Sequence, residues 1–212
     1  MLEHKTISLS DQVFEKLEQD ILSGVYERGE IINESRLSTE LGVSRTPIRE
    51  ALHRLMQEHI IEEVGKGYEI IGITESDLEE IFTIRRYVEG VASKRAALNH
   101  TEEQLAQLKE AIDLQEFYYN KNDSVQIKNM DNLFHSRVYE IAGRMFYDTL
   151  IPLHKKVQKY RQASVKNHTR AQYSVQEHRD IYNAIASGDG DMAEKLTRIH
   201  IENAYKHITE EQ

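Results

Sequence analysis

The sequence contains no cysteine among its 212 residues. Disulfides and thiolate metal ligands are therefore excluded, and a reducing, cytoplasmic location is expected. No stretch approaches the roughly 18–20 apolar residues that a membrane-spanning helix needs. The segment Met1–Ser10 also lacks the apolar centre of a secretory signal, so we expect no membrane partner.

Proline is scarce as well, with Pro47 and Pro152 as its only two occurrences, and the chain has no low-complexity segment or internal repeat. Apolar residues instead recur at helical spacing over most of the chain, which predicts a mainly α-helical protein. The predicted helices span residues 9–22, 34–41, 44–57, 75–98, 102–120, 123–142, 145–164, 172–187 and 190–209.

The exception to the helical pattern lies between the third and fourth predicted helices. Two short β-prone runs, 60–64 and 68–71, flank Gly65-Lys66-Gly67, which is the pattern of a β-hairpin. Three helices followed by a hairpin predict a winged helix-turn-helix domain over residues 1–73. The six later helices predict an all-α helical bundle over residues 74–212.

A positive charge excess is also missing. The net charge is -9, and residues 1–75 hold eight Lys and Arg against fifteen Asp and Glu. DNA-binding domains are usually basic, so any contact with DNA has to come from a local cluster. Such a cluster follows the tight turn at Gly42, on the first turns of the third helix, which in a helix-turn-helix enter the major groove. The predicted DNA contacts are Arg36, Ser44, Arg45, Thr46, Arg49 and Lys66.

An alternative for Arg45 and Arg49 is an ordinary solvated helix face, since isolated arginine pairs commonly have that role. A winged-helix module that binds protein is a second alternative. The position of the pair, after Gly-Val-Ser and ahead of a predicted wing, favours DNA because arginine can bond a guanine edge with two hydrogen bonds.

In the C-terminal half, several polar residues fall on apolar helix faces. Asp131 and His135 are four residues apart on one such face, and His178 and His200 lie on apolar faces of the last two predicted helices. One buried histidine is usually satisfied by a hydrogen bond, but an unpaired buried carboxylate is strongly disfavoured. A divalent metal ion bound by all four would satisfy them together, and these ligands suit zinc first, then nickel, manganese or iron.

Two groups of motifs resemble a known family. "LGVSRTPIREALHRL" (41–55) and "GKGYEI" (65–70) are similar to the DNA-binding domain of the GntR superfamily of bacterial regulators. "DNLFH" (131–135), "EHRDIYNAIASGD" (177–189) and "AEKLTRIH" (193–200) look like the FCD effector domain of FadR-type members. Six C-terminal helices resemble the VanR-type subgroup.

The resemblance implies roles for particular residues. The four positions above would ligate a divalent ion, and a small organic acid or sugar acid would complete its coordination. Arg85, in "RRYVE", matches an arginine that faces the effector pocket, and Arg144 and Asn203 are further candidate effector contacts. His59 and Arg144 depart from the family pattern, which commonly has glycine and asparagine at these two positions.

These observations together predict a homodimeric, ligand-responsive repressor that binds a palindromic DNA operator and is released by a metabolite. A mononuclear metalloenzyme is the alternative, although no general base is evident beside the four ligands. A di-iron site is excluded because the only Glu-x-x-His, Glu50–His53, lies in the DNA-binding helix. Surface or capping roles are expected for the histidines His4, His53, His59, His100, His154 and His168.

Overall fold

A computed structural model of the chain describes residues 7–157 and 168–210. The chain divides into two compact units, Met1–Glu75 and Ser76–Gln212. The division falls two residues beyond the domain boundary that the sequence predicts, just after the first residue of helix α4 (Glu75–Asn99).

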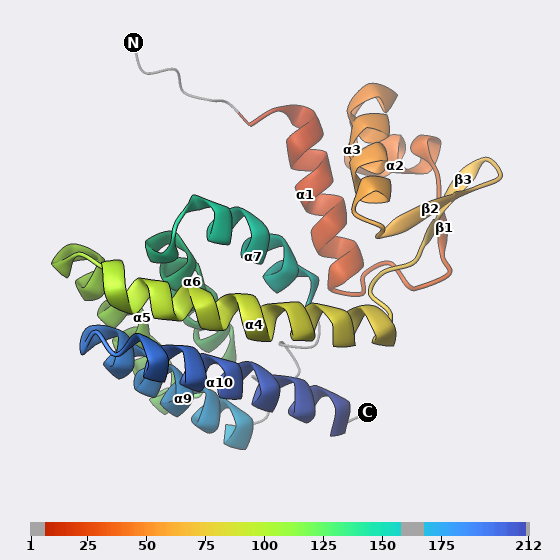
Figure 1. The fold of residues 1–212 in the computed structure, drawn as a ribbon. Coiled ribbons are helices and arrows are strands. Elements are labelled where there is room, and N and C mark those ends of the chain that lie inside the picture. The colour runs from red at the N-terminus through yellow and green to blue at the C-terminus, as the bar shows by residue number, and fades with distance from the viewer. Residues whose placement is uncertain (1–6, 158–167, 211–212) are drawn as a thin grey trace, which may run out of the picture. The chain divides into compact units, whose positions relative to one another are not determined.

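The first unit contains three helices and a small sheet (Figure 1). The helices are α1 (Leu9–Leu22), α2 (Glu34–Leu41) and α3 (Arg45–Gln57). Strands β2 (Ile61–Val64) and β3 (Gly67–Ile70) form the predicted hairpin, and the winged helix-turn-helix is confirmed. A third strand, β1 (Ile31–Ile32), pairs antiparallel with β3 on its other edge.

Local sequence features explain where these elements start and end. Asn33 caps α2 by accepting a hydrogen bond from the Arg36 backbone, and α2 stops at Gly42, whose left-handed backbone (φ 66°) makes the turn into α3. His59 has φ 56°, a left-handed backbone that glycine adopts without strain. The β2–β3 hairpin forms with histidine at this position.

The second unit is a helical bundle. Besides α4 it contains α5 (Glu102–Asn120), α6 (Ser124–Ala142), α7 (Arg144–Lys156), α9 (His168–Ala186) and α10 (Gly190–Glu210). Residues 158–164 of the predicted helix 145–164 lie outside the described residues, and α9 begins four residues earlier than predicted. Among the residues that the structure describes, none of the helices combines the length and apolar character needed to traverse a bilayer.

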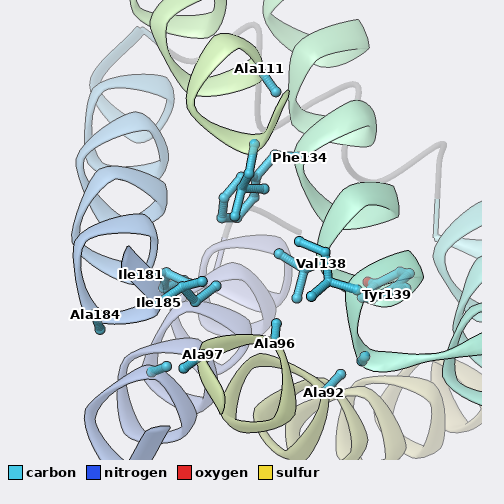
Figure 2. Packing of buried hydrophobic residues seen from close by; sticks show 14 of the residues in the cluster. Ala92, Ala96, Ala97, Ala111, Phe134, Val138, Tyr139, Ile181, Ala184 and Ile185 are labelled. Carbon is cyan, nitrogen blue, oxygen red and sulfur yellow. The ribbon is translucent and has the colours of Figure 1, made fainter. Parts of the chain in front are cut away.

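The bundle core joins small residues of α4 to larger apolar residues of α6 and α9 (Figure 2). Ala92 and Ala96 on α4 are fully buried, and Phe134, Val138 and Ile181 pack in the same cluster. Small side chains let neighbouring helices approach closely, which brings the polar residues on the same helix faces within bonding distance of one another. The site described next lies on these faces.

Candidate functional site

The DNA-binding surface predicted from the sequence is exposed in the first unit. Ser44 precedes α3, and Arg45, Thr46 and Arg49 are exposed on its first two turns, whereas Pro47 and the following Ile48 are buried. The helix therefore turns its apolar face into the core and its polar face outward.

The structure also brings the wing close to this helix. Lys66 at the wing tip and Arg45 line one groove, which is completed by Asn33, Glu34, Ser35, Glu63, Gly67 and Tyr68. Gly67 is required here, because a Cβ at this position would lie 2.8 Å from Ile31 Cγ2 and from the Ile32 carbonyl oxygen. The short strand β1 thus fixes the wing beside the helix-turn-helix.

The predicted DNA-binding arginines are held by side chains of the same unit. Arg49 Nε and Nη2 donate to the two Glu34 carboxylate oxygens at 2.8 and 2.9 Å. Arg36 donates to Glu30 and Glu40 at 2.8 and 2.7 Å. Acidic residues that give this unit its negative charge are therefore paired with the arginines predicted to contact DNA.

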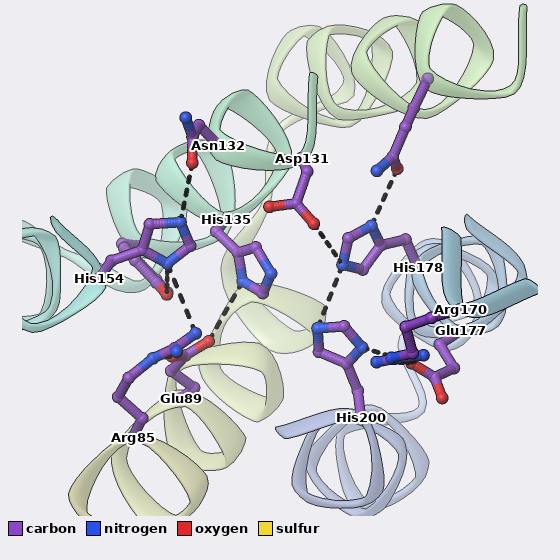
Figure 3. A network of polar contacts seen from close by, with 12 residues as sticks. Arg85, Glu89, Asp131, Asn132, His135, His154, Arg170, Glu177, His178 and His200 are labelled. Atoms are coloured by element: carbon purple, nitrogen blue, oxygen red, sulfur yellow. Dashed lines mark hydrogen bonds and ion pairs between the residues drawn. The ribbon is translucent and has the colours of Figure 1, made fainter. Parts of the chain in front are cut away.

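In the second unit, three imidazoles from three helices meet in the interior (Figure 3). His135 on α6, His178 on α9 and His200 on α10 are 3%, 0% and 4% exposed. The Nε2 atoms of His178 and His200 are 3.2 Å apart, and Asp131 Oδ1 is 3.7 Å from His178 Nε2. The three predicted histidine ligands thus form one group, and Asp131, the fourth predicted ligand, lies beside His178 but outside that group.

The opposite nitrogen of each imidazole faces an oxygen of a second residue. Nδ1 of His135 is 3.2 Å from Glu89 Oε2, and Nδ1 of His178 is 2.9 Å from Gln115 Oε1. Nδ1 of His200 is 2.7 Å from Glu177 Oε2. The oxygens facing His178 and His200 accept the Nδ1 proton, so these two rings leave Nε2 free of its own proton, the arrangement that metal-binding histidines generally have.

This arrangement has an electrostatic consequence. With Nδ1 protonated, the Nε2 lone pairs of His178 and His200 face each other across 3.2 Å and repel unless a cation or proton lies between them. Two nitrogens bound tetrahedrally to zinc at about 2.0–2.1 Å would lie about 3.3 Å apart. The donor set therefore fits a divalent metal ion.

The charge state of the ligands agrees with this fit. Burial lowers the pKa of His200 to about 4, even though the Glu177 carboxylate acts to raise it. Burial acts to raise the pKa of Glu177, but hydrogen bonds from His200 and Asn203 and the charge of Arg170 bring it to about 2. At neutral pH the imidazole is therefore unprotonated at Nε2 and Glu177 is a carboxylate.

A small cavity of about 40 Å³ adjoins the cluster. This volume is enough for a metal ion with a few water molecules, since one water needs about 10–15 Å³ on this measure. Its lining residues are Phe82, Arg85, Gln115, Ile127, Asp131, His135, Arg170, Ala171, Ser174, His200, Ala204 and Ile208.

Arg85, the arginine that the resemblance pointed to, lies in the wall of this cavity. It is 2% exposed, and its Nε donates to Glu89 Oε1 at 2.6 Å. Burial acts to raise the pKa of Glu89, but the Arg85 guanidinium outweighs this effect and holds it well below its usual range. Glu89 therefore connects a buried arginine to the imidazole of His135.

His154 was expected at the surface or in a cap, and that expectation is wrong. It is 6% exposed on α7, with Nε2 at 3.1 Å from Asn132 Oδ1 and Nδ1 at 3.5 Å from Arg85 Nη2. Burial, His135 and Arg85 hold the pKa of His154 well below its usual range. Glu89, His135 and His154 form a second group with metal-binding atoms, but the charge of Glu89 is already balanced by Arg85.

The other two candidate effector contacts lie outside the cavity lining as far as the chain is described. Arg144 is exposed at the first position of α7. Asn203 Nδ2 donates to Glu177 Oε1 at 2.8 Å, so Asn203 supports the carboxylate that holds His200.

Two buried polar residues of the cavity wall were not predicted from the sequence. Gln115 is 0% exposed, and among the described residues no acceptor is bonded to its Nε2. It shares a helical stripe with Leu108, Ala111 and Ile112, so the signal that identified Asp131 could have found it. Arg170 is 8% exposed and donates to Glu177 Oε2 at 3.0 Å.

Comparison with known proteins agrees with this description. Residues 9–68 match the model for "Bacterial regulatory proteins, gntR family", and residues 80–203 match the model for the FCD domain. The chain is 25% identical over 205 residues to the HTH-type transcriptional repressor RspR of Escherichia coli, covering 96% of this chain and 90% of that protein. It is 32% identical over 123 residues to the gluconate operon transcriptional repressor of Bacillus licheniformis, covering 58% and 51%.

Among solved structures, Escherichia coli McbR/YncC has the same fold, with a TM-score of 0.81 at 21% identity over 97% of this chain and 99% of that one. The family and its named relatives are transcription regulators, so the chain is a ligand-responsive DNA-binding regulator and not an enzyme. It belongs to the gntR family of bacterial regulatory proteins and carries a C-terminal FCD domain.

Proposed function

We propose that this regulator binds a divalent metal ion through Asp131, His135, His178 and His200. The supporting observation is the 3.2 Å separation of the His178 and His200 Nε2 atoms, with all three Nδ1 atoms held by other residues. Zinc is the first candidate and nickel, manganese or iron the alternatives. When bound, the ion supplies a positive centre to which an effector oxygen can coordinate.

The effector that we propose is a small organic acid or sugar acid. Two buried guanidinium groups, Arg85 and Arg170, line the cavity together with the amide of Gln115, and arginine pairs readily with carboxylates. One relative is named for an operon of gluconate, a sugar acid, in agreement with this class. The cavity is small, so side chains of its wall would have to move to admit such a molecule.

For the DNA, we propose contacts from Arg36, Ser44, Arg45, Thr46, Arg49 and Lys66. Their support is the exposed start of α3 and the groove that this helix shares with the wing tip. Because bacterial operators lie in the cytoplasm, the regulator would act there. We further propose repression relieved by the effector, since the relatives above are named repressors.

A second copy of the chain is the proposed partner in a homodimer. Exposed apolar residues follow one face of α4 at spacings of three, four and seven: Ile84, Tyr87, Val91 and Leu98. Met192 and Ile199, seven residues apart, are exposed on α10, which is joined to α4 by the 2.8 Å hydrogen bond from Thr197 to Ser93. A two-fold dimer formed on this face would match a palindromic operator.

A thermal-shift screen tests the effector proposal. Purified protein is mixed with organic acids and sugar acids, each with zinc, nickel, manganese or iron, because ligand binding raises the melting temperature by mass action. We expect at least one acid to raise the melting temperature in the presence of metal and to lose this effect when a chelator is added. Shifts that a chelator leaves unchanged would contradict the proposed metal-assisted site.

A further inference from the structure

The ion pair between Arg49 and Glu34 joins the two helices of the helix-turn-helix. Glu34 is the first residue of α2, and Arg49 lies on the second turn of α3. The Arg49 side chain is 67% exposed, whereas that of Glu34 is only 21% exposed. The carboxylate is therefore partly enclosed by the protein, and the guanidinium group extends from it towards solvent.

The pair uses one particular edge of the guanidinium group. Nε and Nη2 donate to Glu34, which leaves Nη1 and the second hydrogen of Nη2 for other partners. The second hydrogen of Nη2 and the neighbouring hydrogen of Nη1 form the end-on edge of the group, with two parallel donors. Guanine presents O6 and N7 in the major groove with a spacing that such an edge can bond.

The same contact changes how Arg49 meets a phosphate. Hydrogen bonds from Arg49 hold the pKa of Glu34 below its usual range, so its carboxylate is charged at neutral pH. A phosphate approaching Arg49 therefore meets a cation whose charge is already balanced. Non-specific DNA binding depends on the number of phosphates that free cations neutralise, so a balanced arginine contributes little to it.

We propose that Glu34 is a positioning residue that determines sequence specificity, because it presents the end-on edge of Arg49 to bases and withholds the charge of Arg49 from phosphates. This inference rests on the proposed role of Arg49 as a base contact. Arg36 is also paired with acidic residues, but there Nη1 donates to Glu30 and Nε to Glu40, so no single carboxylate takes one edge of that guanidinium group.

The test compares full-length variants on two DNA duplexes. One duplex is selected by the wild-type protein from a random pool, and the other is a scrambled sequence of the same composition. Dissociation constants are measured by fluorescence anisotropy over a series of KCl concentrations. The variants are Glu34→Gln, Glu34→Asp, Arg49→Ala and the double variant Glu34→Gln/Arg49→Ala. Glu15→Gln, at an exposed position on α1, is the control with the same change in charge.

For Glu34→Gln we expect the affinity for the scrambled duplex to rise by roughly three- to tenfold, with a salt dependence steeper by about one phosphate contact. The discrimination ratio, which is the affinity for the selected duplex divided by the affinity for the scrambled duplex, should fall. Glu34→Asp keeps the charge but withdraws the carboxylate from Arg49, so the ratio should fall there as well. In the Arg49→Ala background, the Glu34→Gln change should leave the ratio unaltered.

Three outcomes would overturn the inference. The first is a ratio of affinities that stays at the wild-type value in both Glu34→Gln and Glu34→Asp. The second is a fall of this ratio in Glu15→Gln as large as that in Glu34→Gln. The third is an equal change of the ratio on Glu34→Gln in the wild-type and Arg49→Ala backgrounds. That result would mean that the Glu34 carboxylate repels DNA in general and does not position Arg49. If the wild-type protein selects no sequence, or Arg49→Ala retains full discrimination, the proposed DNA contacts themselves fail.

Discussion

The Nδ1 atom of His200 lies 2.7 Å from Oε2 of Glu177, a contact that joins α10 to α9. Arg170 and Asn203 bond the same carboxylate, so its orientation is fixed from several sides. The carboxylate in turn fixes the proton of His200 on Nδ1 and increases the basicity of Nε2. In the proposed metal site, Glu177 would thus orient the imidazole of His200 from behind, as a residue that supports a ligand.

Replacing Glu177 by glutamine should weaken metal binding. The variant Glu177→Gln keeps an acceptor for His200 but loses the negative charge, and such changes behind a ligand typically lower metal affinity by about 10–100-fold. Competition with a chromophoric chelator would measure the zinc dissociation constant. Glu194→Gln, at a carboxylate on α10 that pairs with Arg198, is the control. Equal zinc affinity in Glu177→Gln and wild type would show that this carboxylate has no such role.

Acid should destabilise the metal-free protein through His200. In the unfolded chain this histidine takes up a proton below about pH 6.5, whereas in the folded protein burial lowers its pKa to about 4. The unfolded state therefore binds more protons between these values, and the free energy of unfolding falls as the pH is lowered.

The contribution of His200 to this slope is at most about 1.4 kcal/mol per pH unit. Urea unfolding between pH 7 and 4.5 with a chelator present would measure it, and His200→Gln should show a correspondingly shallower slope. Parallel curves for the two proteins would contradict the assignment of a buried, neutral imidazole.

Removal of the Arg49 side chain should weaken sequence discrimination. Loss of a two-bonded contact with guanine costs about 1–3 kcal/mol, so Arg49→Ala should bind the selected duplex about 5–150-fold more weakly. Its melting temperature should remain near that of wild type, because Arg49 is exposed. Gln57→Ala, at the exposed last residue of α3, serves as the control. Unchanged affinity of Arg49→Ala for the selected duplex would refute the assignment of α3 as the DNA-binding helix.

A charge on the exposed face of α4 should disrupt the proposed homodimer. Val91 is 43% exposed, so Val91→Glu leaves the fold of the chain intact but places a carboxylate in the apolar contact of the two copies, which is unfavourable. Sedimentation velocity should show a shift from dimer to monomer. Val125→Glu, on α6 at a position 66% exposed, should remain dimeric. A monomeric wild type, or a dimeric Val91→Glu, would exclude this face as the interface.

Much of the fold could be predicted from the sequence, because helical spacing, the turn at Gly42 and the glycines around the wing are local signals. Strand β1 could not, since its two residues are too short to show an alternating pattern. Its existence depends on pairing with β3, more than thirty residues later in the chain.

The four proposed metal ligands could be identified in the sequence because polar groups on apolar faces are visible in a single helix. The residues that hold them could not, since they come from other helices: Gln115 on α5 meets His178 on α9, and Glu89 on α4 meets His135 on α6. A single sequence shows which face of a helix is buried but not which faces meet. His154 was missed for the same reason, because its partners Asn132 and Arg85 lie on α6 and α4.

The metal content of the protein tests the central claim most directly. Wild type and the double variant His178→Ala/His200→Ala are incubated with zinc, dialysed and analysed by mass spectrometry of the elements, with His53→Ala/His100→Ala as the matched control. We expect about one zinc ion per chain in wild type and control and essentially none in the double variant. Zinc retained by the double variant at the wild-type level, or absent from all three proteins, would contradict the proposed site.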